Sequence, residues 1–412
     1  MNNTKKILVE ELKTGMYISD LNAPYIDHPF FYNHFIIENE KTIEKIKECG
    51  IRSVYIDPSK GMDEPNAPTY LEINKKMKEM MGKIFAEDKR REENKNIVQI
   101  HVREEIPVAE KVRSKAITTV RNVLNDVRSG QEIATKDVMS TAVLLADTVI
   151  RCPEAIHLIS SIKDKDDYTF QHSVSVCSLL VAFCNITGFD KESIYAVALG
   201  GLLHDVGKAK IDDRILKKPG RLTREEFEII KTHVVEGKKI LDKTRDIPDL
   251  AKHITYEHHE RYDGMGYPTG LKGEEISKIG RMAAICDVYD AMSSERVYHR
   301  ALIPYETLRK IFEWSTYHFD RVLVEQFVHM MGIYPVGTLV MLESGFVSIV
   351  LQQNGGSLLQ PLVRTFYDSF AKRFARPVEI DLSKNTSEKI IGAVSLEQLK
   401  LNINLIDMLQ TA

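Results

Sequence analysis

The spacing of apolar residues changes twice along this chain of 412 residues. Near the start, short β-like runs alternate with one helical stretch. These runs cover residues 6–10, 16–21, 30–37 and 51–56. One helix is expected at residues 39–48, with Asn39 as its N-cap and Gly50 where a helix ends. The pattern predicts a small α+β domain over residues 1–60.

The next stretch differs in composition. Residues 58–68 are rich in Pro, Gly, Asp and Asn, which is typical of a linker. A charged helix is expected at residues 70–95, either as a solvated spacer or as a dimerisation helix. We therefore expect residues 61–107 to be a linker and a charged helix that connect two domains.

Beyond residue 108 the apolar residues recur every three or four positions, which predicts helices. The expected helices cover residues 109–127, 134–150, 191–208, 248–260 and 277–293, and another begins at Pro304. Thr223 and Glu226 form a capping box for one more helix. After Gly332, short alternating runs typical of strands occur at residues 337–343, 347–352, 359–366 and 377–381. The chain is thus expected to be mainly α, with a helical domain over residues 108–332 and a β-rich appendage over residues 333–412.

Composition narrows the class of protein. The net charge of −3 gives no long-range attraction to nucleic acid or to an anionic membrane. The five cysteines form no CxxC pair, which indicates a reducing cytosol. The longest apolar run, residues 174–184, is shorter than the roughly 20 residues that cross a bilayer. We expect a cytoplasmic protein without a membrane span.

Candidate chemistry begins with His204 and Asp205, an imidazole and a carboxylate directly after an apolar stretch. Nitrogen and oxygen ligands of this kind suit a hard or borderline cation. The other candidates lie in or beside helical stretches: His172, His233, His258, His259 and Asp287. A single histidine in an apolar helix is a ligand in roughly one case in ten. Together the candidates indicate a metal site, because a core would otherwise bury several unpaired titratable groups.

Seven candidate ligands exceed the need of one ion and suit two. Two ions ~3.5–4 Å apart hold a bridging hydroxide and clamp both oxygens of a phosphoryl displacement. Lys208 lies four residues after His204, so on a helix both would share a face and the lysine could approach a phosphate. His258 and His259 are adjacent, and on a helix their rings could reach different ions. The mixture of imidazole and carboxylate ligands, with no thiolate, favours iron, manganese or zinc over magnesium.

These motifs resemble a known family. His204-Asp205 with Lys208, followed by His258-His259-Glu260 and the run 263–268, is similar to the HD-GYP subgroup of the HD-domain phosphohydrolases over residues 153–331. Residues 1–60 resemble a domain of unknown function that often precedes it. The resemblance implies an HD-type helical bundle at residues 108–332 and a bacterial phosphodiesterase that opens cyclic di-GMP to linear pGpG, in some members on to GMP.

The resemblance also assigns roles. It implies metal ligation by all seven candidates, with Asp205 between two ions and Lys208 stabilising phosphate charge. Gly266, Tyr267 and Pro268 would shape the substrate entrance and contact a protein partner, and Arg296 would hold substrate phosphate. A glutamate used by three-metal members is Tyr168 here, which predicts two divalent ions, iron or manganese first, with zinc, nickel or cobalt as alternatives. His299 replaces a second basic phosphate contact, with Arg300 beside it.

Two alternatives stay open. The substrate is another cyclic dinucleotide, such as 3′,3′-cyclic GMP-AMP, or the chain is a nucleotide-binding signalling module with little turnover. A homodimer through residues 70–95 is a further expectation. Long nucleic acid is excluded because the sequence shows no extended basic face or aromatic-lined groove.

Overall fold

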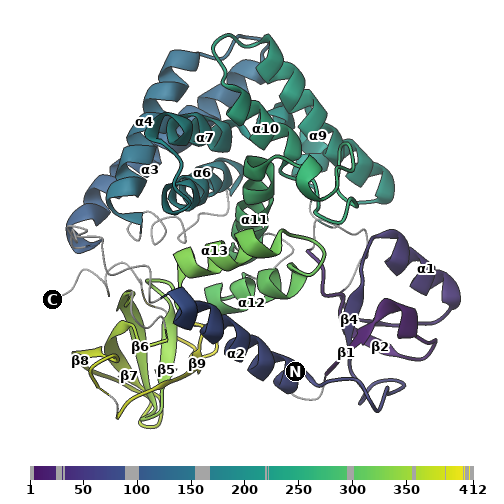
Figure 1. The fold of residues 1–412 in the computed structure, drawn as a ribbon, viewed down its shortest axis with the longest axis vertical. Helices are drawn as coiled ribbons and strands as arrows, with labels where there is room; N and C mark the ends of the chain where they lie inside the picture. The colour runs from purple at the N-terminus through teal and green to yellow at the C-terminus, as the bar shows by residue number, and fades with distance from the viewer. Residues whose placement is uncertain are drawn as a thin grey trace. The chain divides into compact units, whose positions relative to one another are not determined.

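The computed structural model describes residues 4–24, 30, 33–88, 102–153, 168–218, 220, 222–294, 301–354, 359–385, 387–401, 403 and 408. The chain divides into two compact units (Figure 1). The first comprises Met1–Lys83 with Lys217–Glu228, and the second Ile84–Leu216 with Ile229–Ala412. Each unit is described by itself below.

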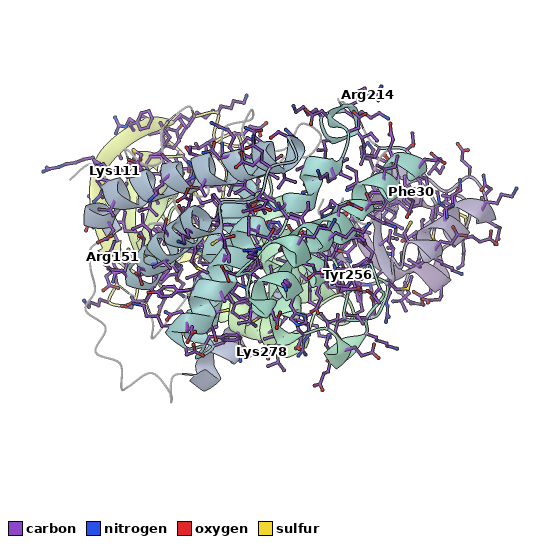
Figure 2. The ribbon with its side chains drawn as sticks, turned by 90° about the horizontal axis from the view of Figure 1, so that it is seen from above. Phe30, Lys111, Arg151, Arg214, Tyr256 and Lys278 are labelled. Carbon is purple, nitrogen blue, oxygen red and sulfur yellow. The ribbon has the colours of Figure 1, made fainter. Side chains whose placement is uncertain are left out.

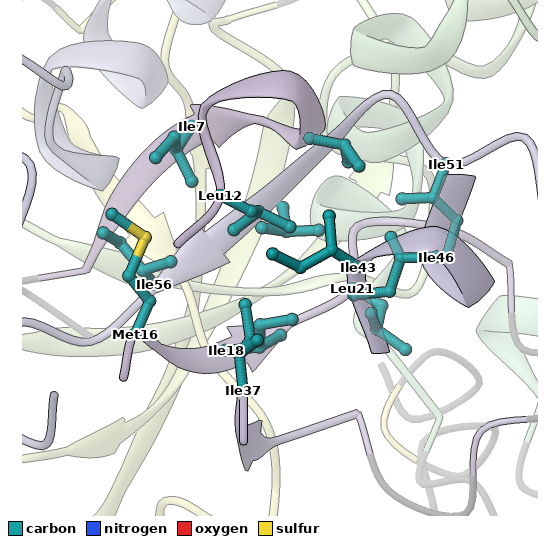
Figure 3. Packing of buried hydrophobic residues seen from close by; sticks show 12 residues of the cluster. Ile7, Leu12, Met16, Ile18, Leu21, Ile37, Ile43, Ile46, Ile51 and Ile56 are labelled. Atoms are coloured by element: carbon teal, nitrogen blue, oxygen red, sulfur yellow. The ribbon is translucent and has the colours of Figure 1, made fainter. Parts of the chain in front are cut away.

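The first unit contains an antiparallel sheet and one short helix. The strand order is β1-β4-β2-β3, with bounds Lys5–Leu8 (β1), Ser53–Ile56 (β4), Tyr17–Asp20 (β2) and Phe35–Ile36 (β3). Helix α1, Glu40–Glu48, places Ile43 and Ile46 in the same apolar cluster as Ile18 (Figure 3). The Asn39 side chain accepts a hydrogen bond from the Thr42 backbone N–H, so the predicted N-cap is confirmed.

A longer helix, α2, follows at Tyr70–Asp88. It corresponds to the charged helix expected at residues 70–95, of which residues 89–95 lie outside the described residues. Thr223 and Glu226, in the segment that belongs to the first unit, form the predicted capping box: each backbone N–H donates to the other residue's side chain, at 2.7 and 3.2 Å.

The second unit is mainly a helical bundle. Its helices are α3 (Val102–Arg128), α4 (Thr135–Arg151), α6 (Tyr168–Ile186), α7 (Lys191–Leu203), α8 (Asp213–Leu216), α9 (Arg224–Lys243), α10 (Asp249–Glu257), α11 (Lys278–Ser293), α12 (Pro304–Trp314) and α13 (Arg321–Met331). Helix α7 packs against α6 and α10, and α11 packs against the same two helices. Lys111, Arg151 and Arg214 extend outward from this unit in Figure 2, so its charged side chains include a peripheral set.

Helix α6 is a core helix of the bundle. Within the described residues, its segment 169–186 is the one stretch long and apolar enough to span a membrane by composition, and 78% of that segment is buried inside the protein. The apolar run noted in the sequence is therefore part of a longer helix than expected, and its apolar character is explained by packing. All five cysteines, which fall among the described residues, are free thiols.

Two helix ends differ from the sequence-based prediction. Helix α7 ends at Leu203 instead of residue 208, and residues Val206–Lys210 form a separate 3₁₀ turn, η3. The turn is pressed against α9, since a Cβ at Gly207 would overlap the carbonyl oxygen of His233. Helix α10 likewise ends at Glu257, three residues early. Tertiary contact of the backbone, which no local pattern reveals, sets the first of these ends.

The C-terminal part is an antiparallel sheet of strand order β8-β7-β6-β5-β9. The strands are β5 (Leu339–Leu342), β6 (Phe346–Gln352), β7 (Leu362–Asp368), β8 (Arg373–Asp381) and β9 (Ile390–Ala393). The four predicted runs correspond to β5 to β8, and the sequence analysis missed β9, a short strand that contains Gly392. The predicted fold class, a mainly α chain with an HD-type bundle and α+β and β-rich flanks, is confirmed.

Candidate metal centre

Five elements of the helical unit bring the seven candidate ligands together. Helix α6 supplies His172, the end of α7 supplies His204 and Asp205, and α9 supplies His233. His258 and His259 directly follow α10, and Asp287 lies on α11. All are buried, except that the His259 side chain stays 11% exposed.

Small residues allow these helices to approach closely. A Cβ at Gly200 would lie 2.7 Å from the Ala251 Cα on α10. A Cβ at Gly201 would lie 2.6 Å from the Cys177 Cα on α6. Both glycines lie about one helical turn before His204. Their close packing therefore places His204 and Asp205 between neighbouring helices.

Asp205 lies among four imidazoles. Its Oδ1 is 3.3 Å from His233 Nε2 and 3.9 Å from His258 Nε2. Its Oδ2 is 3.3 Å from His204 Nε2 and 3.8 Å from His172 Nε2. Each oxygen thus faces a different pair of rings, an arrangement suited to a carboxylate that contacts two cations.

Asp287 contacts the same cluster from α11. Its Oδ1 is 2.9 Å from His172 Nε2 and 3.9 Å from His204 Nε2, and its Oδ2 is 3.8 Å from His259 Nδ1. Among the residues that the structure describes, three sets of ligand atoms lie close enough together to hold an ion: His172-His204-Asp287, His233-His258-His259 and His204-Asp205-His258. The first two sets share no residue, and the third takes one histidine from each.

Backbone carbonyl groups orient three of the rings. His204 Nδ1 lies 2.8 Å from the Gly201 oxygen, and His233 Nδ1 lies 2.6 Å from the Ile230 oxygen. His258 Nδ1 is 3.0 Å from the Thr255 oxygen. A carbonyl can only accept, so Nδ1 donates and Nε2 carries the free lone pair that a cation needs.

The charge states of several candidate ligands also suit a cation, whereas Asp205 raises the pKa of His204 despite its burial. Burial lowers the pKa of His233 to about 4 and that of His258 to about 3, so both are neutral at neutral pH. Burial alone would raise the pKa of Asp205, but the Lys208 ammonium, 2.5 Å away, and His204 hold it well below its usual range. Burial of Asp287 is likewise outweighed by the His172 hydrogen bond, which keeps that pKa well below normal. Neutral imidazoles and ionised carboxylates are the forms that bind metal.

Two buried atoms test whether the residues fit a metal. His204 Nε2 and Asp205 Oδ1 are fully enclosed yet make no hydrogen bond. Buried polar atoms are almost always paired, so an orphaned pair inside one cluster needs a partner of another kind. A divalent cation satisfies both a ring nitrogen and a carboxylate oxygen, and the residues therefore fit a metal centre.

The loop after the histidine pair closes over one edge of the cluster. Tyr267 stacks on His259, with ring centroids 4.7 Å apart. The buried Glu260 carboxylate accepts backbone N–H bonds from Thr269, Gly270 and Leu271, at 2.8, 3.2 and 3.1 Å. This anchor was missed by the sequence analysis, because hydrogen bonds to loop backbone leave no residue pattern.

Gly266 and Pro268 complete the loop. A Cβ at Gly266 would overlap the backbone of Glu260 and Arg261, so the chain passes too close there for any side chain. Pro268 follows Tyr267 through a cis peptide bond. Two of the three residues predicted to shape a substrate entrance, Gly266 and Tyr267, thus lie against the candidate ligand His259.

The remaining predicted residues fall into two groups. Lys208 does not share a helix face with His204, because the helix ends between them. It pairs instead with Asp205 from the 3₁₀ turn η3. Arg296, His299 and Arg300 lie outside the described residues, as does the side chain of Tyr168.

Fold and site together define a class, the helical metal-dependent hydrolases. Family comparisons agree: residues 157–323 match the HD domain. Residues 4–138 match a domain of unknown function, DUF3391, and residues 339–402 match the KOW domain associated with HD domain.

Individual relatives narrow the class further. A cyclic di-GMP phosphodiesterase of Pseudomonas aeruginosa is 35% identical over 395 residues, which cover 94% of this chain and 91% of that protein. A cyclic di-GMP phosphodiesterase of Thermotoga maritima is 36% identical over 185 residues, 45% of this chain and 50% of its own. A 3′3′-cGAMP-specific phosphodiesterase of Vibrio cholerae is 33% identical over 170 residues, 41% of this chain and 33% of its own. The chain belongs to the HD-domain phosphodiesterase family, and the HD-GYP resemblance is confirmed.

Proposed function

We propose that this protein hydrolyses cyclic di-GMP to linear pGpG with two divalent cations held by the buried histidines and aspartates. The observation that supports it most directly is the Asp205 carboxylate, whose two oxygens face different pairs of imidazoles. The choice of cyclic di-GMP as substrate is supported by the cyclic di-GMP phosphodiesterase of Pseudomonas aeruginosa, which aligns with nearly the whole chain.

Each part of the chain has a role in this proposal. His172, His204 and Asp287 would hold one cation, His233, His258 and His259 the other, and Asp205 would contact both. Bound there, the cations would acidify a water molecule and neutralise phosphoryl charge. Lys208 keeps Asp205 ionised and, with its side chain 24% exposed, can also meet an incoming phosphate. Tyr267 shields one side of His259.

The finer assignments also belong to the proposal. Imidazole and carboxylate ligands without thiolate favour iron or manganese, with zinc, nickel or cobalt as alternatives. Tyr168 at the position of a third-metal glutamate supports two ions, and Arg296 and Arg300 are proposed phosphate contacts. We further propose a cytoplasmic location, a homodimer and a protein partner at the Gly266-Tyr267-Pro268 loop.

The test combines metal analysis with turnover. Protein purified without oxygen is expected to carry close to two ions per chain and to convert cyclic di-GMP to pGpG, resolved from GMP by chromatography. His204→Ala should abolish turnover, while His329→Ala on α13 serves as a control outside the cluster. Absence of turnover with iron, manganese and zinc in turn would overturn the proposal.

The alternatives are weaker but testable in the same assay. The mixed-nucleotide phosphodiesterase of Vibrio cholerae aligns over a third of its own length, whereas the cyclic di-GMP relative aligns over most of its chain. Competition between the two cyclic dinucleotides separates these substrates. Tight cyclic di-GMP binding without cleavage in the metal-loaded protein would indicate a signalling module instead.

A further inference from the structure

His172 differs from its neighbours in how its outer nitrogen is held. The Nδ1 atoms of His204, His233 and His258 each contact a neutral backbone carbonyl. His172 Nδ1 instead lies 2.6 Å from Oδ2 of Asp290, a side chain that is only 4% exposed. Asp290 belongs to none of the candidate ligand sets.

Side chains of a single helix, α11, contact both ring nitrogens of His172. Asp287 and Asp290 are three residues apart on α11 and therefore share a helix face. Asp287 Oδ1 is 2.9 Å from Nε2 on one side of the ring, and Asp290 contacts Nδ1 on the other. The ring has little freedom left, because α11 is buried from Met282 to Met292 around these two carboxylates.

We propose that Asp290 is a positioning residue for the metal centre. An ionised carboxylate can only accept, so Asp290 keeps one proton of His172 on Nδ1. A bound cation would then take the Nε2 lone pair, replacing the hydrogen bond from Nε2 to Asp287. Negative charge behind the ring also makes Nε2 a stronger donor than a backbone carbonyl would. The inference rests on the proposed metal centre, and it assigns His172 stronger electron donation than His204, His233 and His258, whose Nδ1 atoms contact carbonyl groups.

Loss of such an outer contact typically weakens metal binding roughly 10–100-fold. Asp290→Ala removes the acceptor, and Asp290→Asn keeps the shape and an acceptor oxygen but removes the charge. We expect both variants to bind Mn²⁺ more weakly at one of two sites, Ala more than Asn. Titration with Mn²⁺, read from the electron paramagnetic resonance signal of the free ion, measures this without any turnover.

A structural role must be separated from a positioning role. The contact also ties α6 to α11, so its loss lowers stability whether or not metal is involved. Glu313→Gln is a matched control: Glu313 is a buried carboxylate of the same unit, 3.1 Å from Arg309, far in sequence from every ligand. This variant should lower the melting temperature and leave Mn²⁺ affinity and the visible spectrum of the Co²⁺-loaded protein unchanged.

A double-mutant cycle gives the sharpest outcome. In a His172→Ala background, Asp290→Asn should cause no further loss of Mn²⁺ affinity, because the residue acts through that ring. Equal losses in both backgrounds, or wild-type Mn²⁺ affinity and an unchanged Co²⁺ spectrum in Asp290→Asn, would overturn the inference. If Asp290→Ala fails to fold, the Asn variant still decides. Wild-type protein that binds two ions but leaves cyclic di-GMP intact would defeat the proposed function alone.

Discussion

Both units of this protein bury apolar side chains, but the helical unit also buries a cluster of imidazoles and carboxylates. The N-terminal unit is centred on an aliphatic cluster (Figure 3). In the helical unit, the imidazoles and carboxylates lie on α6, α9 and α11 and at the ends of α7 and α10. Apolar burial is non-directional and scales with area, whereas a ligand must present one atom in one direction. The first core should therefore tolerate exchanges of shape, and the second should not tolerate the loss of a single oxygen.

The largest effect is expected at Asp205. Replacing it by Asn keeps the shape but removes the charge that faces four imidazoles. We expect kcat for cyclic di-GMP to fall on the order of 10³-fold, about 4 kcal/mol, and the metal-induced rise in melting temperature to disappear. The exposed Asp249→Asn on α10 is the control and should change neither quantity. A retained metal response in Asp205→Asn would argue against its central role.

Truncation of the aliphatic core should cost stability and nothing else. Ile18 is fully buried and lies on β2, so Ile18→Ala is expected to reduce the free energy of unfolding by about 2–5 kcal/mol. Ile18→Val should cost about 0.5–1.5 kcal/mol. Urea denaturation measures both, and Mn²⁺ affinity of the folded variants should equal that of the wild type. A change in affinity would show that the two cores are coupled.

The pH response should belong to the polar core. Burial lowers the folded-state pKa of His233 to about 4 and of His258 to about 3, from an ordinary value of 6.5. As the pH falls from about 6.5 toward 4, the unfolded chain binds protons that these folded rings refuse, so the metal-free protein loses stability. His204 acts in the opposite direction, because Asp205 raises its pKa despite burial. The net loss is measurable by denaturation in chelator between pH 7 and about pH 4.5; an equal response in a His233→Ala, His258→Ala double variant would contradict this origin.

The smallest effect is expected at a helix end of the N-terminal unit. Asn39→Ala removes the acceptor for the Thr42 N–H and should cost about 1 kcal/mol of stability. Asn39→Ser and Asn39→Asp preserve an acceptor and should restore most of it. Circular dichroism during thermal unfolding measures the difference. A change of metal affinity in a cap variant would contradict the independence of the N-terminal unit and the metal centre.

Sequence reasoning went furthest where chemistry was local. The His-Asp pair, the histidine doublet and Asp287 were recognisable because several titratable groups in apolar helices need a common purpose. The Asn39 cap and the strands β1, β2 and β4 follow from short-range rules and were also recovered. These features depend on neighbours that are close in the chain.

Features that depend on backbone approach were not recoverable. The end of α7 at Leu203 is set by packing of η3 on α9, and the anchoring of the loop by Glu260 requires three backbone N–H groups to converge. Asp290 is an intermediate case. Its spacing from Asp287 is visible in the sequence, but its partner lies 118 residues away, so the spacing alone could not reveal the contact.

Gly207 has a consequence for the dimensions of the metal centre. It lies two residues after Asp205, and its main chain touches that of His233, with no side chain between them. The close approach of η3 and α9 beside these two ligands is thus a contact of main chain with main chain. Side-chain exchanges elsewhere in the bundle can shift helices, but the contact between Gly207 and His233 contains no side chain that could be exchanged.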